Sequence, residues 1–364
     1  MIEKKIVKTT ELQDFVAEVL HQNGLEKRQA EITADVLVSA DQRGINSHGV
    51  ARLKRYIDGL KDGTIRSNPS VRIVKETPVS LVIDGDGGMG QPVAFDAMTK
   101  CIEKAKQSFM CFASIRNSNH YGIAGYYTLM ALKENLIGVS LTNTAPLVVP
   151  TFGKEVVIGT NPISIGVPAK DEKPFLLDMA TSTVPRGKIE VYARKEEEIP
   201  DSWACNELGE PSTDASLILD NLINRRGGGL LPLGGGKELT GGHKGYGLSV
   251  AVDIFCSVLS SGLVGAEVYG QKGEPAGVTH FLGAISPEAF VGSDEVRENM
   301  THYIRMLKNA EKAEGQARIY IHGEKEFEAE EQNREKIGLE RVVFETLNLL
   351  GKPFGLILSN LSDK

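Results

Sequence analysis

No apolar run in this sequence of 364 residues is long enough to cross a membrane. A transmembrane helix needs about 20 consecutive apolar residues, whereas the long apolar stretch from Leu248 to Leu259 is interrupted by Asp253. The N-terminal segment also has no apolar core of the kind found in secretion signals. We therefore expect a cytoplasmic protein without membrane contact.

Cysteine is scarce and scattered. The four cysteines, Cys101, Cys111, Cys205 and Cys256, form no C-x-x-C pair and lie in apolar surroundings. Disulfide frameworks and zinc sites need cysteines at characteristic spacings. The pattern argues against both and indicates reduced thiols in an intracellular protein.

Positive charge is not in excess. Lys and Arg number 41 against 48 Asp and Glu, so the net charge is -7. Affinity for nucleic acids rests largely on Lys and Arg that neutralise phosphates, and we therefore expect no nucleic-acid partner. A small molecule is the more suitable ligand.

Glycine, in contrast, is abundant. It accounts for 39 of the 364 residues, about 11%, where average usage is about 7%. The other proportions, 41% apolar and 24% charged, are ordinary for a globular protein, and at about 150 residues per domain the length suggests two domains or one large compact body. The glycines gather in clusters, where tight turns and close backbone approaches are expected.

The pattern of elements predicts an α/β protein with a helical N-terminal part. Three amphipathic helices fill the first 65 residues, and Thr10 with Gln13 forms a capping box for the first of them. From Val79 onward, short β-type runs alternate with helices, as in an α/β layer. The predicted strands are 79–84, 109–115, 136–143, 162–168 and 174–179, with helices at 93–106 and 123–134.

The second half of the chain is less regular. Residues 184–245 look irregular, and a long apolar helix that starts near Gly241 is expected to be buried. A polar helix at 294–314, a short strand at 317–323 and an amphipathic helix at 334–350 follow. We place residues 1–75 together with 315–364 in a mainly helical domain, and residues 76–314 in an α/β cofactor-binding domain.

The sequence GDGGMG at 85–90 matches the dinucleotide fingerprint G-x-G-x-x-G between a strand and a helix. Asp84 and Asp86, however, would oppose a pyrophosphate, and no acidic residue ends the next predicted strand. Arg116, beside that position, could instead contact a 2′-phosphate. The simpler interpretation is a turn that needs left-handed glycines.

Two segments contain histidines in settings suited to proton transfer. His48, Arg52 and Tyr56 have the spacing i, i+4, i+8, which would align them on one helix face after Ser47. An arginine can grip a carboxylate through two hydrogen bonds while a histidine exchanges a proton. His120 follows a predicted strand, at a strand end where ligand sites of α/β proteins concentrate. Ordinary surface or structural residues remain the alternative in both cases.

Several polar stretches could cradle a cofactor. LTNTAP at 141–146 and GTNPI at 159–163 place hydroxyl and amide groups at strand ends. Asp178, which ends a predicted buried strand, could bind a ribose or cap a helix. His243 and Lys244 lie among glycines before the long helix, which suits a phosphate or a plain helix entry.

Five motifs in order, SHGVARLKRY, SNHYGIAGYY, GTNPI, DMATS and GGHKGYGL, resemble those of the type 2 malate/L-lactate dehydrogenase family. The resemblance covers about residues 8–350 and is closest to the archaeal-type malate dehydrogenases. It implies a non-Rossmann NAD(P)-binding sheet domain, a helical domain formed by the N- and C-terminal parts, and a homodimer with the active site at the subunit interface.

The resemblance also implies roles for particular residues. His48 or His120 would be the proton donor, and Ser47, Arg52 and Thr160 would contact substrate, with Arg52 on its carboxylate. The cofactor, NAD or NADP, would be contacted by Asn143, Thr144, Asp178, Met179, Ala180, His243, Lys244 and, more loosely, His322, Gly323 and Glu324.

The expected reaction is hydride transfer between a nicotinamide and a small 2-oxo or 2-hydroxy acid, with oxaloacetate and malate foremost and no metal. Lactate-, sulfolactate- and ureidoglycolate-type substrates are the alternatives within the family. A more remote alternative is a metal-dependent hydrolase or lyase that uses His48, His120 and Asp178. A ligand-binding protein without catalysis is the weakest, because binding alone does not need two histidines in glycine-rich loops.

Overall fold

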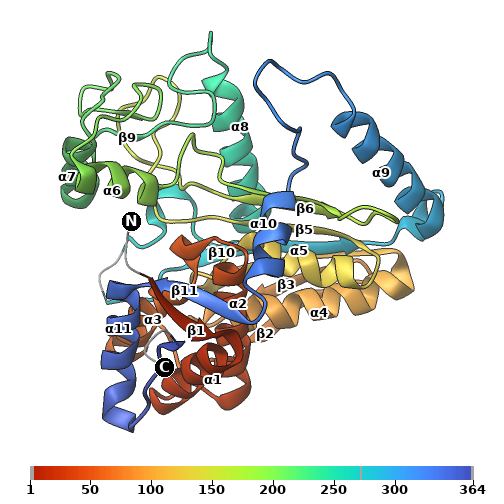
Figure 1. Ribbon diagram of the computed structural model, residues 1–364, viewed down its shortest axis with the longest axis horizontal. Coiled ribbons are helices and arrows are strands. Elements are labelled where there is room, and N and C mark those ends of the chain that lie inside the picture. The colour runs from red at the N-terminus through yellow and green to blue at the C-terminus, as the bar shows by residue number, and fades with distance from the viewer. Residues whose placement is uncertain (1–3, 271–272, 362–364) are drawn as a thin grey trace.

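The computed structural model describes residues 4–270 and 273–361 (Figure 1). Its strands are β1 Lys4–Lys8, β2 Arg72–Glu76, β3 Ser80–Asp84, β4 Met110–Ser118, β5 Ile137–Thr142, β6 Ile163–Val167, β7 Phe175–Met179, β8 Ala204–Cys205, β9 Gly229–Leu230, β10 Val278–Ile285 and β11 Lys336–Glu340. Its α-helices are α1 Thr9–Gln22, α2 Lys27–Gln42, α3 Leu53–Asp62, α4 Gly90–Ser108, α5 Ala124–Lys133, α6 Arg186–Lys195, α7 Ala215–Asn224, α8 Gly242–Asp253, α9 Ser293–Lys308, α10 Glu324–Gln332 and α11 Arg341–Gly351. None of the helices in these ranges is both long and apolar enough to span a bilayer.

A seven-stranded sheet forms the centre of the molecule. Its order is β2-β3-β4-β10-β5-β6-β7, and only β3 and β4 are parallel. Leu282 and Ala284 of β10 pack in the core that contains α4, whereas Phe281, directly before Leu282, packs with Val252 and Cys256 on the other face, so helices cover both faces. The prediction of an α/β fold is confirmed, and a sheet with one parallel pair is not the doubly wound sheet of a Rossmann fold.

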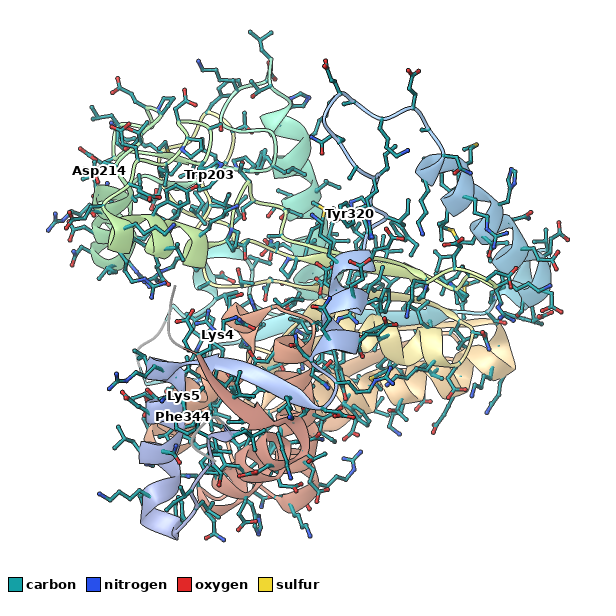
Figure 2. All side chains as sticks on the ribbon, viewed as in Figure 1. Lys4, Lys5, Trp203, Asp214, Tyr320 and Phe344 are labelled. Carbon is teal, nitrogen blue, oxygen red and sulfur yellow. The ribbon has the colours of Figure 1, made fainter. Side chains whose placement is uncertain are left out.

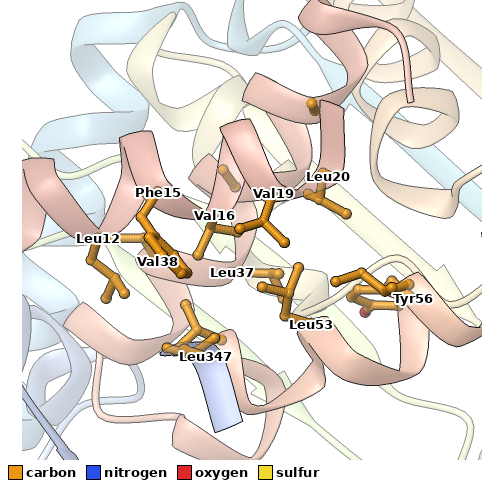
Figure 3. Close-up of a cluster of buried hydrophobic side chains, with 14 of the residues drawn as sticks. Leu12, Phe15, Val16, Val19, Leu20, Leu37, Val38, Leu53, Tyr56 and Leu347 are labelled. Atoms are coloured by element: carbon orange, nitrogen blue, oxygen red, sulfur yellow. The ribbon is translucent and has the colours of Figure 1, made fainter. Parts of the chain in front are cut away.

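The helical part is built from both ends of the chain. Strand β1 pairs with β11, and α1, α2, α3 and α11 enclose one apolar core (Figure 3). Leu12 of α1, Leu37 of α2, Leu53 of α3 and Leu347 of α11 are all buried in it. This core carries α3, the helix that leads into the candidate site.

Several predicted elements differ from the structure. The capping box is wrong, because β1 runs directly into α1 at Thr9 and the Gln13 amide donates instead to Asp35. The helix predicted at 334–350 is β11 followed by α11, since β1 supplies a strand partner. Residues 317–323 form no strand, although the Leu176 N–H donates to the His322 carbonyl.

Other differences arise from contacts over long sequence distances. Strand β10, in the middle of the sheet, was not predicted, because its partners β4 and β5 lie more than a hundred residues earlier. The segment 184–245 contains α6 and α7, and Figure 2 shows Trp203, which packs edge-on against Tyr192, and Asp214, which caps α7. The helix expected to be buried, α8 with the π-helical turn Ile254–Val258, exposes apolar side chains along one side.

The GDGGMG segment is a structural turn, as its simpler interpretation predicted. Asp84 is buried and accepts hydrogen bonds from Arg116 and Asn117. A Cβ at Gly90, the first residue of α4, would lie 2.2 Å from the Asn119 carbonyl oxygen and 2.6 Å from that of His120. The backbone at Asn119 and His120 therefore fills the space at the start of α4. Because position 90 is glycine, this backbone can approach closely, and the contact positions His120.

Gly90→Ala tests this close approach. The added methyl group would meet backbone that cannot swing away, so we expect a loss of about 1–3 kcal/mol in the free energy of unfolding. Gly187→Ala in α6 is the matched control, because its Cβ meets nothing within 4 Å and alanine should add about 0.5–1 kcal/mol to a helix. Urea unfolding measures both, and equal effects of the two substitutions would contradict the close packing.

Candidate active site

The structure brings the two candidate histidines together. His48 lies in a 3₁₀ turn, Asn46–His48, between α2 and α3, and His120 lies in the turn after β4. Their rings stack with centroids 5.5 Å apart and planes inclined by 24°. Two residues that the sequence presented as separate candidates thus share one site.

His48, Arg52 and Tyr56 do not lie on one continuous helix, so that expectation is wrong. A second 3₁₀ turn, Val50–Arg52, follows Gly49, and α3 starts only at Leu53. Both flanking residues nevertheless reach His120, His48 by stacking and Tyr56 through its hydroxyl group. The local spacing was interpreted as a helix because Gly49, which interrupts it, has an extended backbone that only the structure shows.

Hydrogen bonds determine the tautomer of His120. The Tyr56 hydroxyl lies 2.7 Å from Nδ1, and the Gly122 N–H donates to the same nitrogen at 3.3 Å. A backbone N–H can only donate, so Nδ1 is the acceptor and the ring proton resides on Nε2. His120 therefore offers one N–H donor at Nε2.

The site is positively charged around neutral imidazoles. Burial, with added repulsion from Arg52 and Arg55, lowers the pKa of His48 to about 4. Burial also lowers the pKa of His120 well below its usual value, with contributions from His48, Arg55 and Arg52. Both rings are thus uncharged at neutral pH in this arrangement.

Ser47 and Arg52 complete this group. The Ser47 hydroxyl lies 2.9 Å from Nδ1 of His48, and Nε of Arg52 donates to the Ser47 carbonyl at 2.6 Å. Within residues 4–270 and 273–361, no carboxylate pairs with Arg52. Its guanidinium group is held at one nitrogen and can grip a carboxylate with the others.

Asp41, which sequence reasoning missed, holds the backbone between His48 and Arg52. Its carboxylate accepts the Val50 N–H at 2.7 Å, and a Cβ at Gly49 would lie 2.2 Å from the carboxyl group. Asp41 is 4% exposed, and burial raises its pKa to about 7. The available signal was an acidic residue on an otherwise apolar helix face, shortly before a glycine.

A second group of predicted residues lies at the ends of β5 and β6. The Thr160 N–H donates to the Thr144 hydroxyl at 2.9 Å, and a Cβ at Gly159 would lie 2.3 Å from the same oxygen. Asn143 is buried, and its amide is engaged by Ser257, the Leu263 carbonyl and the Thr279 N–H. Both threonine side chains are half-buried and reach solvent, whereas the Asn143 side chain is used within the protein.

Asp178, Met179 and Ala180 lie at the end of β7, which is an edge strand rather than the buried strand predicted. The Asp178 carboxylate accepts the N–H of Gly125, in the first turn of α5, at 2.7 Å. Asp178 is exposed as a residue, and desolvation of its carboxyl group by the neighbouring protein atoms raises the pKa to about 6. Asp178 thus ties the end of β7 to the start of α5 and does not cap a helix that follows it in the chain.

The remaining predicted cofactor residues flank these strands. His243 and Lys244 are exposed in the first turn of α8. The Gly242 and Lys244 N–H groups there donate to the Lys237 and Gly241 carbonyls, so the lysine charge and the helix dipole are what favour an anion. The loop His322–Glu324 contacts β7, since Gly323, with φ of 93°, packs on Leu176. Glu324 pairs with Lys308 and Arg318, so its carboxylate is already neutralised.

The metal-site alternative gains no support from the arrangement of side chains. In the part of the chain that the structure describes, no three His, Cys, Asp or Glu side chains are grouped so as to hold a metal ion. The Asp178 carboxylate binds the Gly125 N–H, and Nδ1 of His120 accepts from Gly122.

Asp41→Asn tests the buried carboxyl group through pH. A folded-state pKa above the unfolded value of about 4 means that the folded protein loses stability as pH rises from about 4 to 7. Asparagine keeps an oxygen for the Val50 N–H and carries no charge. We therefore expect the variant to gain free energy of unfolding relative to the parent as pH rises, by about 2–4 kcal/mol at pH 8.

Urea unfolding at pH 5, 6.5 and 8 measures this gain. Asp14→Asn, which removes an exposed carboxylate from α1, should give a far smaller pH-dependent difference. Because asparagine can add a constant offset, the slope against pH is the informative quantity. A difference that does not change with pH would mean that Asp41 is ionised without penalty.

Comparison with known proteins places this geometry in a family. The model of a family described as malate/L-lactate dehydrogenase matches residues 7–348. The malate dehydrogenase of Pyrococcus abyssi is 47% identical over 348 residues, 95% of this chain and 94% of the relative. The L-sulfolactate dehydrogenase of Methanocaldococcus jannaschii is 37% identical over 98% of this chain and 99% of its own. The crystal structure of malate dehydrogenase from Entamoeba histolytica has a TM-score of 0.93 at 36% identity, and covers 97% of this chain and 99% of that one. The chain belongs to the malate/L-lactate dehydrogenase family.

Proposed function

We propose that the protein transfers hydride reversibly between a nicotinamide cofactor and C2 of a small 2-oxo or 2-hydroxy dicarboxylate, with oxaloacetate and malate as the preferred pair. The observation that carries this proposal is the stacked pair His48 and His120 beside Arg52, a guanidinium group without a carboxylate partner among the described residues. The names of similar proteins, malate dehydrogenase and L-sulfolactate dehydrogenase, support a substrate with two acidic groups.

In the proposed reduction, each side chain has a separate task. Arg52 holds the C1 carboxylate through two hydrogen bonds, and Nε2–H of His120 donates to the C2 carbonyl oxygen. His48 delivers the proton to that oxygen, because its Nδ1 faces the Ser47 hydroxyl, which can accept as well as donate. The Gly122 N–H, in contrast, favours the uncharged form of His120.

Substrate binding helps His48 to take up this proton. Arg52 and Arg55 contribute to its lowered pKa. A bound carboxylate offsets part of their charge, and the pKa of His48 then rises towards its usual range. The dianionic substrate thereby prepares its own proton donor.

The residues around β5–β7 and α8 fit a nicotinamide dinucleotide. Exposed Lys244 at the start of α8 suits a phosphate, and the half-buried hydroxyls of Thr144 and Thr160 offer hydrogen bonds. We infer that Thr144 and Lys244, together with Met179, Ala180, His243 and the loop His322–Glu324, hold the cofactor, with Asn143 and Asp178 shaping the site. Thr160, which donates its N–H to the Thr144 hydroxyl, lies beside them and contacts the substrate in this proposal. The cofactor, when bound, supplies or accepts the hydride.

Glutamine substitutions at the two histidines test their tasks. His48→Ala and His48→Gln should both lower kcat by about 10²- to 10⁴-fold, since neither side chain transfers a proton. His120→Ala should lower kcat by about 10²- to 10³-fold through loss of the hydrogen bond to the oxygen. His120→Gln retains an N–H donor and should recover part of this loss.

The assay is oxaloacetate-dependent oxidation of NADH and, in parallel, of NADPH, which also measures the cofactor preference. If His48→Gln recovered part of the lost kcat and His120→Gln did not, then His120 would deliver the proton and His48 would donate the hydrogen bond to the carbonyl oxygen. Near-normal turnover in all four variants would reject the mechanism. Loss of activity on chelation, without any oxidation of NADH or NADPH, would favour the metal-dependent alternative.

We further propose that the protein is a homodimer whose active site lies near the subunit interface. One side of α8 and the segment after it exposes apolar side chains, with Val258 59% and Leu259 53% exposed. The set comprises Leu248, Ile254, Phe255, Val258, Leu259, Leu263 and Val264. A contiguous apolar surface of this kind is typical of protein interfaces, and the same helix begins with His243 and Lys244.

Val258→Lys tests the dimer. A buried lysine at an apolar interface is strongly unfavourable, so we expect the variant to be monomeric when the parent is dimeric. Light scattering after size-exclusion chromatography measures the mass. Val342→Lys in α11, where valine is also exposed, should leave the dimer intact, and a dimeric Val258→Lys variant would place the interface elsewhere.

A further inference from the structure

A second guanidinium group, that of Arg55, lies beside the two histidines. Arg55 is in the first turn of α3, three residues after Arg52. Residues three apart at a helix start are neighbours on its surface, and both charges depress the pKa of both histidines. The two arginines therefore act on the same small region.

Arg55 lines a cavity of about 680 Å³ that also contains His120 and Tyr56 in its wall. Within the described part of the chain, no carboxylate forms an ion pair with Arg55. Three acidic groups lie in the cavity wall: Asp58 pairs with Lys54, Asp62 accepts from Thr64, and Glu274 forms no ion pair with Arg55 in the part of the chain that the structure describes. Arg55 thus has no ion-pair partner among the acidic side chains of the described wall.

Tyr269, from the segment before β10, fixes the position of Arg55. Nη2 of Arg55 donates to the Tyr269 hydroxyl at 2.6 Å, and the guanidinium carbon lies 5.4 Å from the ring centroid. Tyr269 has φ of 57°, a left-handed conformation that is unfavourable for a bulky residue. Its N–H donates to the Ala276 carbonyl at 2.9 Å, which helps to hold this strained backbone.

An arginine that served only as a solvated surface charge would not need these contacts with Tyr269. An exposed arginine in water needs no strained tyrosine to hold it, whereas a recognition site benefits from a donor group whose orientation is set in advance. A fixed guanidinium group without an acidic partner, in a cavity with His120, is suited to a small anionic group.

From these contacts we infer that Arg55 binds a second acidic group of the substrate, attached at C3, while Arg52 binds the carboxylate at C1. The inference rests on the proposed function, because it assigns the substrate class of the same site. The selected substrates are 2-oxo acids with a carboxylate or a sulfonate on C3. Monocarboxylates such as pyruvate leave Arg55 without a partner and gain nothing from it.

Arg55→Gln, assayed with three 2-oxo acids, tests the inference. We expect kcat/KM for oxaloacetate and for sulfopyruvate to fall by about 10- to 100-fold, the usual effect of losing a charge-assisted hydrogen bond. The value for pyruvate should stay almost unchanged and shows that the variant is folded. Arg55→Lys, which keeps the charge without the fork, should retain part of the selectivity.

The matched control is Lys61→Gln. It removes one positive charge from an exposed lysine of the same helix that does not line the cavity, and it should leave the ratio of kcat/KM for oxaloacetate to that for pyruvate unchanged. The ratio removes the part of any effect of Arg55 on the pKa values of the histidines that is common to all substrates.

The outcomes distinguish a failure of the proposed function from a failure of the role of Arg55. Reduction of none of the three acids by the parent enzyme, with either NADH or NADPH, would reject the proposed function itself. A parent enzyme that prefers pyruvate, or an Arg55→Gln variant that loses the same factor for all three acids, would overturn the role of Arg55 and leave the dehydrogenase activity standing. Whichever of oxaloacetate and sulfopyruvate has the higher kcat/KM with the parent enzyme identifies the preferred acidic group, a carboxylate or a sulfonate.

Discussion

The hydrogen bond between the Tyr56 hydroxyl and Nδ1 of His120 connects the two halves of the structure at the candidate site. Tyr56 belongs to α3, whose Leu53 and Ile57 are buried in the core formed by both chain ends. His120 follows β4, and the Asn119 side chain ties that strand end to the Gly87 and Gly88 carbonyls. The packing of the helical part therefore determines where Tyr56 lies, and the packing of the sheet part determines where His120 lies. A displacement of either part would change the hydrogen bond at Nδ1 of His120.

Electrostatics explains why the site is incomplete without a ligand. Arg52 and Arg55 carry fixed charges next to two imidazoles that burial keeps neutral, and no carboxylate of the described residues balances them. Uncompensated charge near a protein interior is unfavourable and is characteristic of functional sites. In the proposed reaction, an anionic substrate would remove this imbalance, which would give binding and proton transfer a common physical cause.

Close backbone contacts require glycine at two positions of the candidate site. Gly49 allows the Asp41 carboxyl group to approach the chain next to His48, and Gly90 allows α4 to start against the turn that bears His120. Each position has a neighbour closer than any side chain tolerates, so glycine is required by contact rather than by flexibility. The GDGGMG sequence thus serves the site through packing, although it resembles a dinucleotide fingerprint.

The sequence by itself determined the α/β class, most strands of the sheet and the residue types of the site, because hydrophobic periodicity and short motifs are local properties. His48, Arg52 and His120 were recognised from such motifs. Strand β10, Asp41 and the contact between Arg55 and Tyr269 were not, since each depends on partners that are distant in the sequence or on a backbone turn at Gly49. Only the tertiary structure decided which histidines meet, which tautomer His120 adopts and which arginines of the site lack a carboxylate partner among the described residues, because burial and hydrogen bonding are properties of the folded chain.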